Sequence, residues 1–219
     1  YIILISLFSL TFISCSEKEE SSTTPTTSSP LFVGVGDNGT ILTSSDGTTW
    51  TSRTSGTTEK LRGGAYGNST LVVVGLSGTI LTSPDGTTWT SRTSGTTEGL
   101  RGITYENSTF VAVGESSTIL TSSDGTSWDN RTSGTTRNLW DVIYGNSNFV
   151  TVGNSGTIYT SSDNGSTWIQ RTSGTSKKLN GVTYANSTFV TVGGSGTILT
   201  SSDGTSWDNG TSETTRNLW

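Results

Sequence analysis

Short apolar runs recur along the chain, each one flanked by turn residues. In the third copy of the pattern, strand-like segments cover residues 100–105, 109–113, 118–122 and 128–132. The segment 109–113 is apolar at successive positions rather than at alternate ones, which is typical of a strand covered on both faces. Short β-branched and aromatic segments separated by glycine, asparagine and serine predict an all-β fold.

A tryptophan marks every copy of this pattern, at intervals of 39 or 40 residues. A constant period of this length predicts a repeat architecture. Each tryptophan follows a turn that holds an aspartate and a glycine, and we expect it to start the outer strand of its copy. We expect the aspartate to accept hydrogen bonds from nearby backbone amides, the glycine to permit the reversal, and the indole to be buried. These five aspartate turns contain Asp46 and Trp50, Asp85 and Trp89, Asp124 and Trp128, Asp163 and Trp168, and Asp203 and Trp207.

Stacking such units about an axis predicts a β-propeller with four-stranded antiparallel blades in a domain at 31–219. The repeats cover about 31–53, 60–93, 100–132, 139–172 and 179–210. The first repeat lacks its opening strand, and residues 217–219 match the beginning of one at 138–140. Five blades closed by this C-terminal segment are the simplest interpretation, since closure removes exposed sheet edges. A longer chain with six or more blades is the alternative.

One copy, at residues 161–168, reads Ser-x-Asp-x-Gly-x-Thr-Trp, which resembles the Asp-box (BNR) motif of bacterial sialidases and related β-propellers. The pattern Val-Gly-x-x-Gly-Thr-Ile-Leu-Thr-Ser-x-Asp-Gly-x-x-Trp is similar to the repeats of photosystem II assembly-factor-like proteins. The resemblance implies a propeller that either hydrolyses glycosides or grips a protein partner without catalysis. The Phe-Arg-Ile-Pro segment of sialidases does not occur in this sequence, and nothing in it points to a photosynthetic setting.

The N-terminal residues 1–15 are typical of an export signal. Residues 1–14 are apolar and short for a membrane span, and Phe12-Ile13-Ser14-Cys15 resembles a bacterial lipobox. That resemblance implies a lipid on Cys15, whereas a plain signal peptide with an incidental cysteine is the alternative. Residues 16–30 are rich in serine, threonine and proline and predict a solvated linker. Because no methionine begins the sequence, we expect the chain to be a fragment.

Composition narrows the chemistry of the domain. The sequence has no histidine and one cysteine, which excludes Ser-His-Asp and Cys-His nucleophilic sites and ordinary zinc sites. Its net charge of −5 and the absence of a basic run disfavour nucleic acid as a partner. Catalysis would need paired carboxylates, and calcium would need several oxygen ligands where each turn offers one carboxylate. We therefore expect no enzyme activity, no metal and no cofactor.

Residues that differ between copies are the candidates for a ligand site. In propellers of this type, the loops after the second strands and the loops between blades share one face, opposite the aspartate turns. The candidate ligand face comprises Asp37, Asn38, Glu59, Lys60, Arg62, Glu98, Arg101, Glu115, Arg137, Trp140, Asp141, Asn154, Lys177, Lys178 and Asn180. Mixed charge beside an aromatic residue suits a protein or glycan contact, although ordinary solvated loop tips would look similar.

Two further features leave alternatives open. Asp141 stands where other copies have glycine, so its carboxylate either contacts a ligand near the axis or reflects local packing. An arginine follows four of the five tryptophans by three residues, which favours edge protection or salt bridging over a binding ring. The series comprises Arg53, Arg92, Arg131 and Arg171.

The sequence thus predicts a lipid-anchored, extracytoplasmic β-propeller that binds a protein or glycan without catalysis. A sialidase-like glycoside hydrolase and a purely structural surface module are the alternatives. We expect a monomer in the periplasm or at the cell surface of a bacterium, attached to a membrane only through the lipid on Cys15.

Overall fold

The computed structural model describes residues 32–219, so the expected signal, Cys15 and the linker lie outside the described residues. Residues 32–219 form five antiparallel sheets, and the strands within each sheet pair in chain order. This arrangement confirms the predicted all-β fold. We call the sheets blades 1 to 5.

Blades 2 to 5 each hold four strands, whereas blade 1 holds three. Blade 1 contains β1 (Phe32–Val35), β2 (Ile41–Ser44) and β3 (Thr51–Arg53). Blade 2 contains β4 (Leu61–Gly67), β5 (Thr70–Gly75), β6 (Ile80–Ser83) and β7 (Thr90–Arg92). Blade 3 contains β8 (Leu100–Glu106), β9 (Thr109–Gly114), β10 (Ile119–Ser122) and β11 (Asp129–Arg131).

The last two blades repeat this order. Blade 4 contains β12 (Leu139–Gly145), β13 (Asn148–Gly153), β14 (Ile158–Ser161) and β15 (Ile169–Arg171). Blade 5 contains β16 (Leu179–Ala185), β17 (Thr188–Gly193), β18 (Ile198–Ser201) and β19 (Asp208–Asn209). Short 3-10 turns follow β1, β9, β13 and β17, namely η1 (Asp37–Gly39), η2 (Glu115–Ser117), η3 (Asn154–Gly156) and η4 (Gly194–Gly196). No helix within residues 32–219 is long and apolar enough to cross a membrane.

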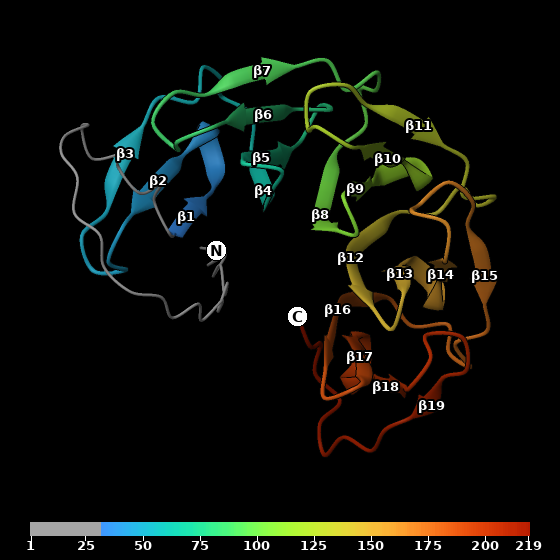
Figure 1. Ribbon diagram of the computed structural model, residues 1–219. Helices are drawn as coiled ribbons and strands as arrows, with labels where there is room; N and C mark the ends of the chain where they lie inside the picture. The colour runs from blue at the N-terminus through green and yellow to red at the C-terminus, as the bar shows by residue number, and fades with distance from the viewer. Residues whose placement is uncertain (1–31) are drawn as a thin grey trace, which may run out of the picture.

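The five blades stand side by side along an open arc, with β4, β8, β12 and β16 nearest its centre (Figure 1). Burial follows this arrangement. Residues 71–74 of β5 and 110–113 of β9 are all buried, because neighbouring blades cover both faces of these strands. The outer strands are not covered in this way, and Thr90 and Ser91 of β7, for example, are exposed to solvent.

A hydrophobic core fills each of the four junctions between successive blades. Between blades 2 and 3, for example, Val72 and Ile80 belong to one buried cluster with Phe110, and Trp128 packs against it. The ring centroids of Phe110 and Trp128 lie 6.3 Å apart. Trp168 is buried in the next core, between blades 3 and 4. The indoles of Trp89, Trp128, Trp168 and Trp207 therefore attach their aspartate turns to the junctions, whereas Trp50 belongs to none of the four cores.

The turn after the second strand of each repeat needs a left-handed residue. Gly78 has a φ of 66°, and a Cβ atom there would lie 2.0 Å from the carbonyl oxygen of Thr96. Only glycine fits such a close approach without a shift of the backbone. Ser117 departs from the glycine pattern and still has a φ of 64°, so the turn keeps its shape in blade 3.

The five-bladed ring closure expected from the sequence is not formed by the described residues. Blade 1 has no fourth strand from residues 217–219, and its sheet lies at the other end of the arc from blade 5 (Figure 1). The Leu218 N–H instead donates to the Gly193 carbonyl, 2.9 Å away in blade 5. The same hydrogen bond joins the Leu61 N–H to the Gly36 carbonyl, where the inner strand of blade 2 begins beside blade 1. Residues 217–219 therefore continue the arc beyond blade 5.

Candidate functional site

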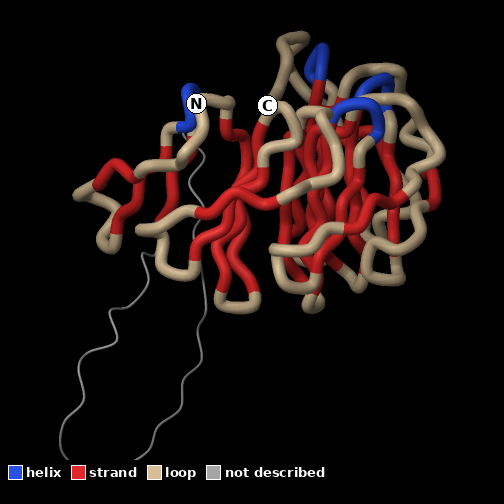
Figure 2. The backbone as a smooth tube through the Cα atoms, turned by 90° about the horizontal axis from the view of Figure 1, so that it is seen from above, coloured by secondary structure: helices blue, strands red, loops and turns tan. Residues whose placement is uncertain are grey.

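Two sets of loops form one face of the arc, which we call the loop face. The Gly39 N–H donates to the Glu59 carbonyl at 2.9 Å, which ties the η1 turn to the segment between blades 1 and 2. The other 3-10 turns lie on the same side (Figure 2). The aspartate turns lie at the opposite end of the strands, where the Asn68 side chain donates to the Ser123 carbonyl at 3.4 Å. The structure therefore separates candidate ligand residues from structural turns.

Every complete blade carries a β-bulge at the second residue of its inner strand. In β12, Leu139 pairs with Gly153 and Asp141 pairs with Val152, so Trp140 is the extra residue. A bulge redirects a side chain and interrupts the pairing of a strand. The four bulge residues are Arg62, Arg101, Trp140 and Asn180.

Trp140 forms the centre of a row of side chains on the loop face. Its indole N–H donates to the Asn154 side-chain oxygen at 2.7 Å, which fixes the ring. The Lys178 ammonium lies 3.7 Å from the ring centroid, and the Arg101 guanidinium lies 5.0 Å from it. Both distances are within the range of cation–π contacts. We call Arg62, Arg101, Trp140 and Lys178 the Trp140 row.

The cations of the Trp140 row have few anionic partners. Arg101 forms an ion pair with Glu115, whereas Arg62 and Lys178 form none with any residue in 32–219. Burial lowers the pKa of Arg62, and the nearby positive charge of Arg101 lowers it further. The pKa of Lys178 is also lowered, first by burial and then by Arg101. This part of the face therefore carries positive charge that its own carboxylates only partly balance.

Three buried polar atoms at the bulges have no hydrogen-bond partner within the described part of the chain. They are the Arg62 Nε, the Arg101 Nε and the Asn180 Oδ1 atoms. Buried donors and acceptors are nearly always paired in folded proteins, so a group that lacks a partner requires an explanation. All three lie at bulge positions, which makes the inner rim of the loop face the place where an additional polar group would be best accommodated.

Asp141 is next to the row but is held by the fold. Its two carboxylate oxygens accept hydrogen bonds from the Val142 and Val182 backbone amides, each at 2.9 Å. Val182 belongs to the neighbouring blade, so the carboxylate links β12 to β16. Burial raises the pKa of Asp141 to about 6, although the two amides act in the opposite direction. Of the two interpretations of Asp141, this geometry favours local packing.

The remaining candidates are not gathered into one site. Lys60 pairs with Asp37 at the blade 1 end of the arc. Glu59 and Glu98 accept hydrogen bonds from the hydroxyls of Ser77 and Ser116, at 3.1 and 3.0 Å. The side chains of Asn38, Arg137 and Lys177 are exposed, and Arg137 donates to the Ser155 carbonyl at 3.2 Å.

The sequence analysis missed Trp219 as a member of this face. The Lys178 ammonium lies 5.2 Å from its ring centroid, and the residue is 81% exposed. The signal was present, because Trp219 occupies the position of Trp140 in the repeat. The expected ring closure would have placed this segment in the inner strand of blade 1, away from Lys178.

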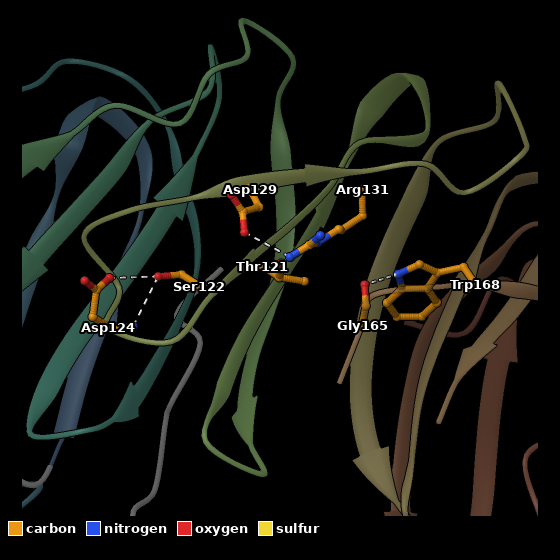
Figure 3. A network of polar contacts seen from close by, with 7 residues as sticks. All are labelled: Thr121, Ser122, Asp124, Asp129, Arg131, Gly165 and Trp168. Carbon is orange, nitrogen blue, oxygen red and sulfur yellow. Dashed lines mark hydrogen bonds and ion pairs between the residues drawn. The ribbon is translucent and has the colours of Figure 1, made fainter. Parts of the chain in front are cut away.

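The aspartate turns on the opposite face have closed hydrogen-bond sets. Asp124 accepts hydrogen bonds from the Thr126 and Ser127 amides at 2.7 and 2.9 Å. The Ser122 hydroxyl also donates to Asp124, at 3.0 Å (Figure 3). These bonds hold the pKa of Asp124 well below its usual range. The Trp168 indole N–H donates to the Gly165 carbonyl at 3.0 Å (Figure 3).

The recurrent arginines lie on the outer strands. Arg131 donates from Nε to the Thr121 hydroxyl at 2.8 Å and pairs with Asp129 at 2.9 Å (Figure 3). Arg53, Arg92 and Arg171 donate to the equivalent threonines at the same distance. Each arginine thus ties an outer strand to its neighbour, as a residue protecting a sheet edge would.

Hydroxyl-rich grooves lie along the outer rim of the loop face, away from the Trp140 row. One, of about 770 Å³, is lined mainly by serine, threonine and glycine, with Arg92 and Glu98. A similar groove of about 820 Å³ lies two blades further on and includes Arg171 and Tyr159. No group of three acidic or sulfur side chains that could hold a metal occurs within residues 32–219.

Solved structures with similar folds are β-propellers. One is "YCF48 bound to D1 peptide", at 18% identity and a TM-score of 0.63, over 81% of this chain and 62% of that one. A GH74 enzyme of Niastella koreensis matches at 20% identity with a TM-score of 0.58, over 81% of this chain and 28% of that one. The WD40 propeller domain of Doa1 matches at 14% identity with a TM-score of 0.65, over 84% of this chain and 66% of that one.

This chain spans less than two thirds of the YCF48 chain that was solved with the D1 peptide. No protein-family model matches the sequence, and no curated protein matches it. At these identities the likeness shows the fold alone, so the comparisons define the class of protein as a β-propeller and leave its ligand to be inferred from the loop face.

Proposed function

We propose that the chain is a non-catalytic binding module that holds an extended, acidic segment of a protein partner across the Trp140 row. The observation that carries this proposal is an indole flanked by two cations, with Arg62 and Lys178 forming no ion pair to any residue that the structure describes. Partly buried cations that pair with no described carboxylate favour a ligand that supplies one. An indole beside them offers a flat apolar surface for the ligand backbone or a side chain.

The comparison with YCF48 supports a peptide ligand, since that propeller was solved with one. A glycan is the second candidate, because exposed indoles and hydroxyl-rich grooves also suit sugars. The positive charge of the row favours the acidic peptide over a neutral glycan.

The glycosidase alternative finds little support in the described residues. Each carboxylate near the row already has a partner: Glu115 pairs with Arg101, and both oxygens of Asp141 accept backbone amides. A glycosidase needs two carboxyl groups available to the substrate at a set separation. The tyrosines at the equivalent repeat positions pack in the fold, as Tyr184 does against Phe189 at a centroid distance of 4.4 Å.

Anchoring of the module to a membrane through Cys15 is a separate proposal, which the apolar run, the loose lipobox and the serine- and threonine-rich linker support. Metabolic labelling with a palmitate analogue tests it. We expect label on the wild-type chain and none on Cys15→Ser. Equal labelling of the two chains would contradict the anchor and would leave the binding proposal untouched.

The binding proposal is tested on arrays of acidic and neutral extended peptides, with a glycan array in parallel. We expect acidic peptides to bind, and Trp140→Ala or Lys178→Glu to weaken them roughly tenfold or more. Lys177→Glu is the matched control, because it makes the same charge change on an exposed neighbour outside the row. Unchanged affinity in both row variants would refute this site, and binding only to glycans would replace the ligand class.

A further inference from the structure

The groove on the outer rim of blade 4 differs in its chemistry from the equivalent groove of blade 2. It has a volume of about 820 Å³, which lies within the range of small-molecule sites. Arg137 and Arg171 line it, and its lining among the described residues includes no carboxylate. Most of the other lining residues are serine, threonine and glycine. We call this space the blade 4 groove.

The equivalent groove of blade 2 shows what the repeat provides by itself. This blade 2 groove has about 770 Å³ and the same hydroxyl-rich lining, but its one arginine, Arg92, is accompanied by the carboxylate of Glu98. The carboxylate of Glu59 lies at its edge, where it accepts a hydrogen bond from a serine hydroxyl of the groove at 3.1 Å. In blade 4, the equivalents of Glu59 and Glu98 are Arg137 and Lys177. The repeat thus exchanges acidic for basic residues around the blade 4 groove.

The fold holds both arginines of the blade 4 groove in place. Arg171 donates from Nε to the Thr160 hydroxyl at 2.8 Å, and Arg137 donates from one terminal nitrogen to the Ser155 carbonyl at 3.2 Å. No carboxylate among residues 32–219 forms an ion pair with either arginine. The two guanidinium groups are therefore positioned by neutral partners, and their positive charge is left for a ligand to balance.

The outer strand of blade 4 also lacks the carboxylate that neutralises the equivalent arginine in blade 3. There, Asp129 pairs with Arg131 at 2.9 Å. Ile169 occupies the position of Asp129 in blade 4 and is 53% exposed. Because an isoleucine cannot pair with a cation, the charge of Arg171 is not balanced from within its own strand.

Two uncharged side chains further distinguish the blade 4 groove. Tyr159 and Gln170 stand where blade 2 has Leu81 and Ser91. The Tyr159 hydroxyl donates to the side-chain oxygen of Gln170 at 3.5 Å, and Gln170 is exposed. The amide nitrogen of Gln170 is then the group left to donate to a ligand. An amide beside serine and threonine hydroxyls matches the many hydroxyl groups of a sugar.

We propose that the blade 4 groove binds a carboxylate-bearing sugar, with Arg137 and Arg171 on the carboxylate and Gln170 on the sugar hydroxyls. A guanidinium binds a carboxylate through two parallel hydrogen bonds. An acidic peptide matches this groove less well, because peptide recognition uses pockets for side chains or a sheet edge. The one aromatic residue of the lining, Tyr159, is only 3% exposed. The groove is separate from the Trp140 row, so this proposal does not rest on the function proposed there.

Calorimetric titration with tetragalacturonate, with its fully methyl-esterified form and with tetraglutamate tests the proposal. We expect tetragalacturonate to bind, and the neutral ester and the acidic peptide to bind roughly tenfold more weakly or not at all. Arg137→Gln and Arg171→Gln should each weaken tetragalacturonate roughly tenfold. Arg92→Gln is the matched control, because it removes the same arginine-to-threonine hydrogen bond in the blade 2 groove. It should leave the affinity unchanged.

A double variant separates loss of binding from loss of the fold. Tyr159→Leu combined with Gln170→Ser introduces the residues that blade 2 carries at these positions, which this fold already accommodates. We expect it to retain the near-ultraviolet circular dichroism of a folded chain and to bind tetragalacturonate roughly threefold more weakly or worse.

A wild-type chain that does not bind tetragalacturonate would overturn the proposal. Equally tight binding of the ester would exclude the carboxylate contact, and equally tight binding of tetraglutamate would exclude the sugar. Equal weakening by Arg92→Gln and Arg171→Gln would show a general attraction to positive charge rather than a site. Loss of the sugar in Lys178→Glu but not in Arg171→Gln would move the sugar to the Trp140 row and refute the assignment to the blade 4 groove.

Discussion

Replacing Asp141 by asparagine should remove a pH dependence of stability that is built into the junction of blades 4 and 5. The wild-type carboxylate accepts amide hydrogen bonds from Val142 in its own strand and from Val182 in the next blade. Asparagine keeps the size of the side chain and one acceptor oxygen but carries no charge at any pH. The comparison therefore isolates the cost of burying the charge.

The magnitude follows from the raised pKa. Below its ordinary pKa of 3.8, Asp141 is protonated in both the folded and the unfolded chain and contributes no difference. Above a folded-state pKa of about 6, it is ionised in both, and burial of the charge penalises the folded state. The interval between the two pKa values corresponds to roughly 3 kcal/mol. The free energy of unfolding should fall by this amount relative to Asp141→Asn as the pH rises from about 4 to about 7.

Urea unfolding followed by indole fluorescence, at a series of pH values, measures this difference. The aspartate turns do not disturb it, because wild type and Asp141→Asn contain the same five turns, whose lowered pKa values contribute equally to both proteins and cancel in the difference. The absolute stability of Asp141→Asn at neutral pH is less informative. It combines the relief of a buried charge with the loss of one amide hydrogen bond, and these two effects oppose each other.

Asp141→Gly is a useful companion, because glycine occupies the equivalent positions 63, 102 and 181. It should also lack the loss of stability between about pH 4 and about pH 7. If wild type and both variants share one pH profile, or if wild type gains stability across this window relative to them, the assignment of a buried, penalised carboxylate is refuted.

Two further predictions concern the aspartate turns. Asp124→Ala should lower the free energy of unfolding by about 1–2 kcal/mol at neutral pH, since two amides lose their acceptor. This loss should shrink as the pH falls below the ordinary aspartate pKa. The pKa of Asp124 is lowered in the folded protein, so the stabilisation by its carboxylate disappears as the group is protonated. A loss of stability that is constant with pH would contradict this assignment. Trp168→Ala should lower the free energy of unfolding by about 3–5 kcal/mol, and Trp50→Ala should lower it clearly less. The reason is that Trp168 is buried between two blades, whereas Trp50 lies at the free end of the arc. Equal shifts of the two urea midpoints would show that packing at the junctions does not determine the contribution of the indole.

Much of the local structure could be predicted from the sequence. The strand segments 100–105, 109–113 and 118–122 agree with β8, β9 and β10 to within one residue at each end. The outer strand β11 begins at Asp129, so Trp128 closes the turn instead of starting the strand. These features depend on residues that are close in the chain, whose turn chemistry and apolar patterning act over a few positions.

The loop face was predicted as a set of residues but not as a site. Arg101, Trp140 and Lys178 come together because a bulge redirects one residue of each inner strand and adjacent blades bring these residues side by side. Nothing in a run of four or five residues signals such a bulge. Lys177 and Lys178 are neighbours in sequence, yet only Lys178 contacts the indole.

The sequence by itself determined the repeat, the strands and the chemistry of the aspartate turns, because each of these depends on neighbours within one copy. Only the tertiary structure decided which residues meet across blades, such as Asp141 and Val182, and where positive charge gathers around Trp140. It also decided the open arc that separates β1 from β17 (Figure 1). The physical reason is that these contacts depend on the rotation between successive blades. That rotation results from packing at the junctions between copies, and no single copy contains it.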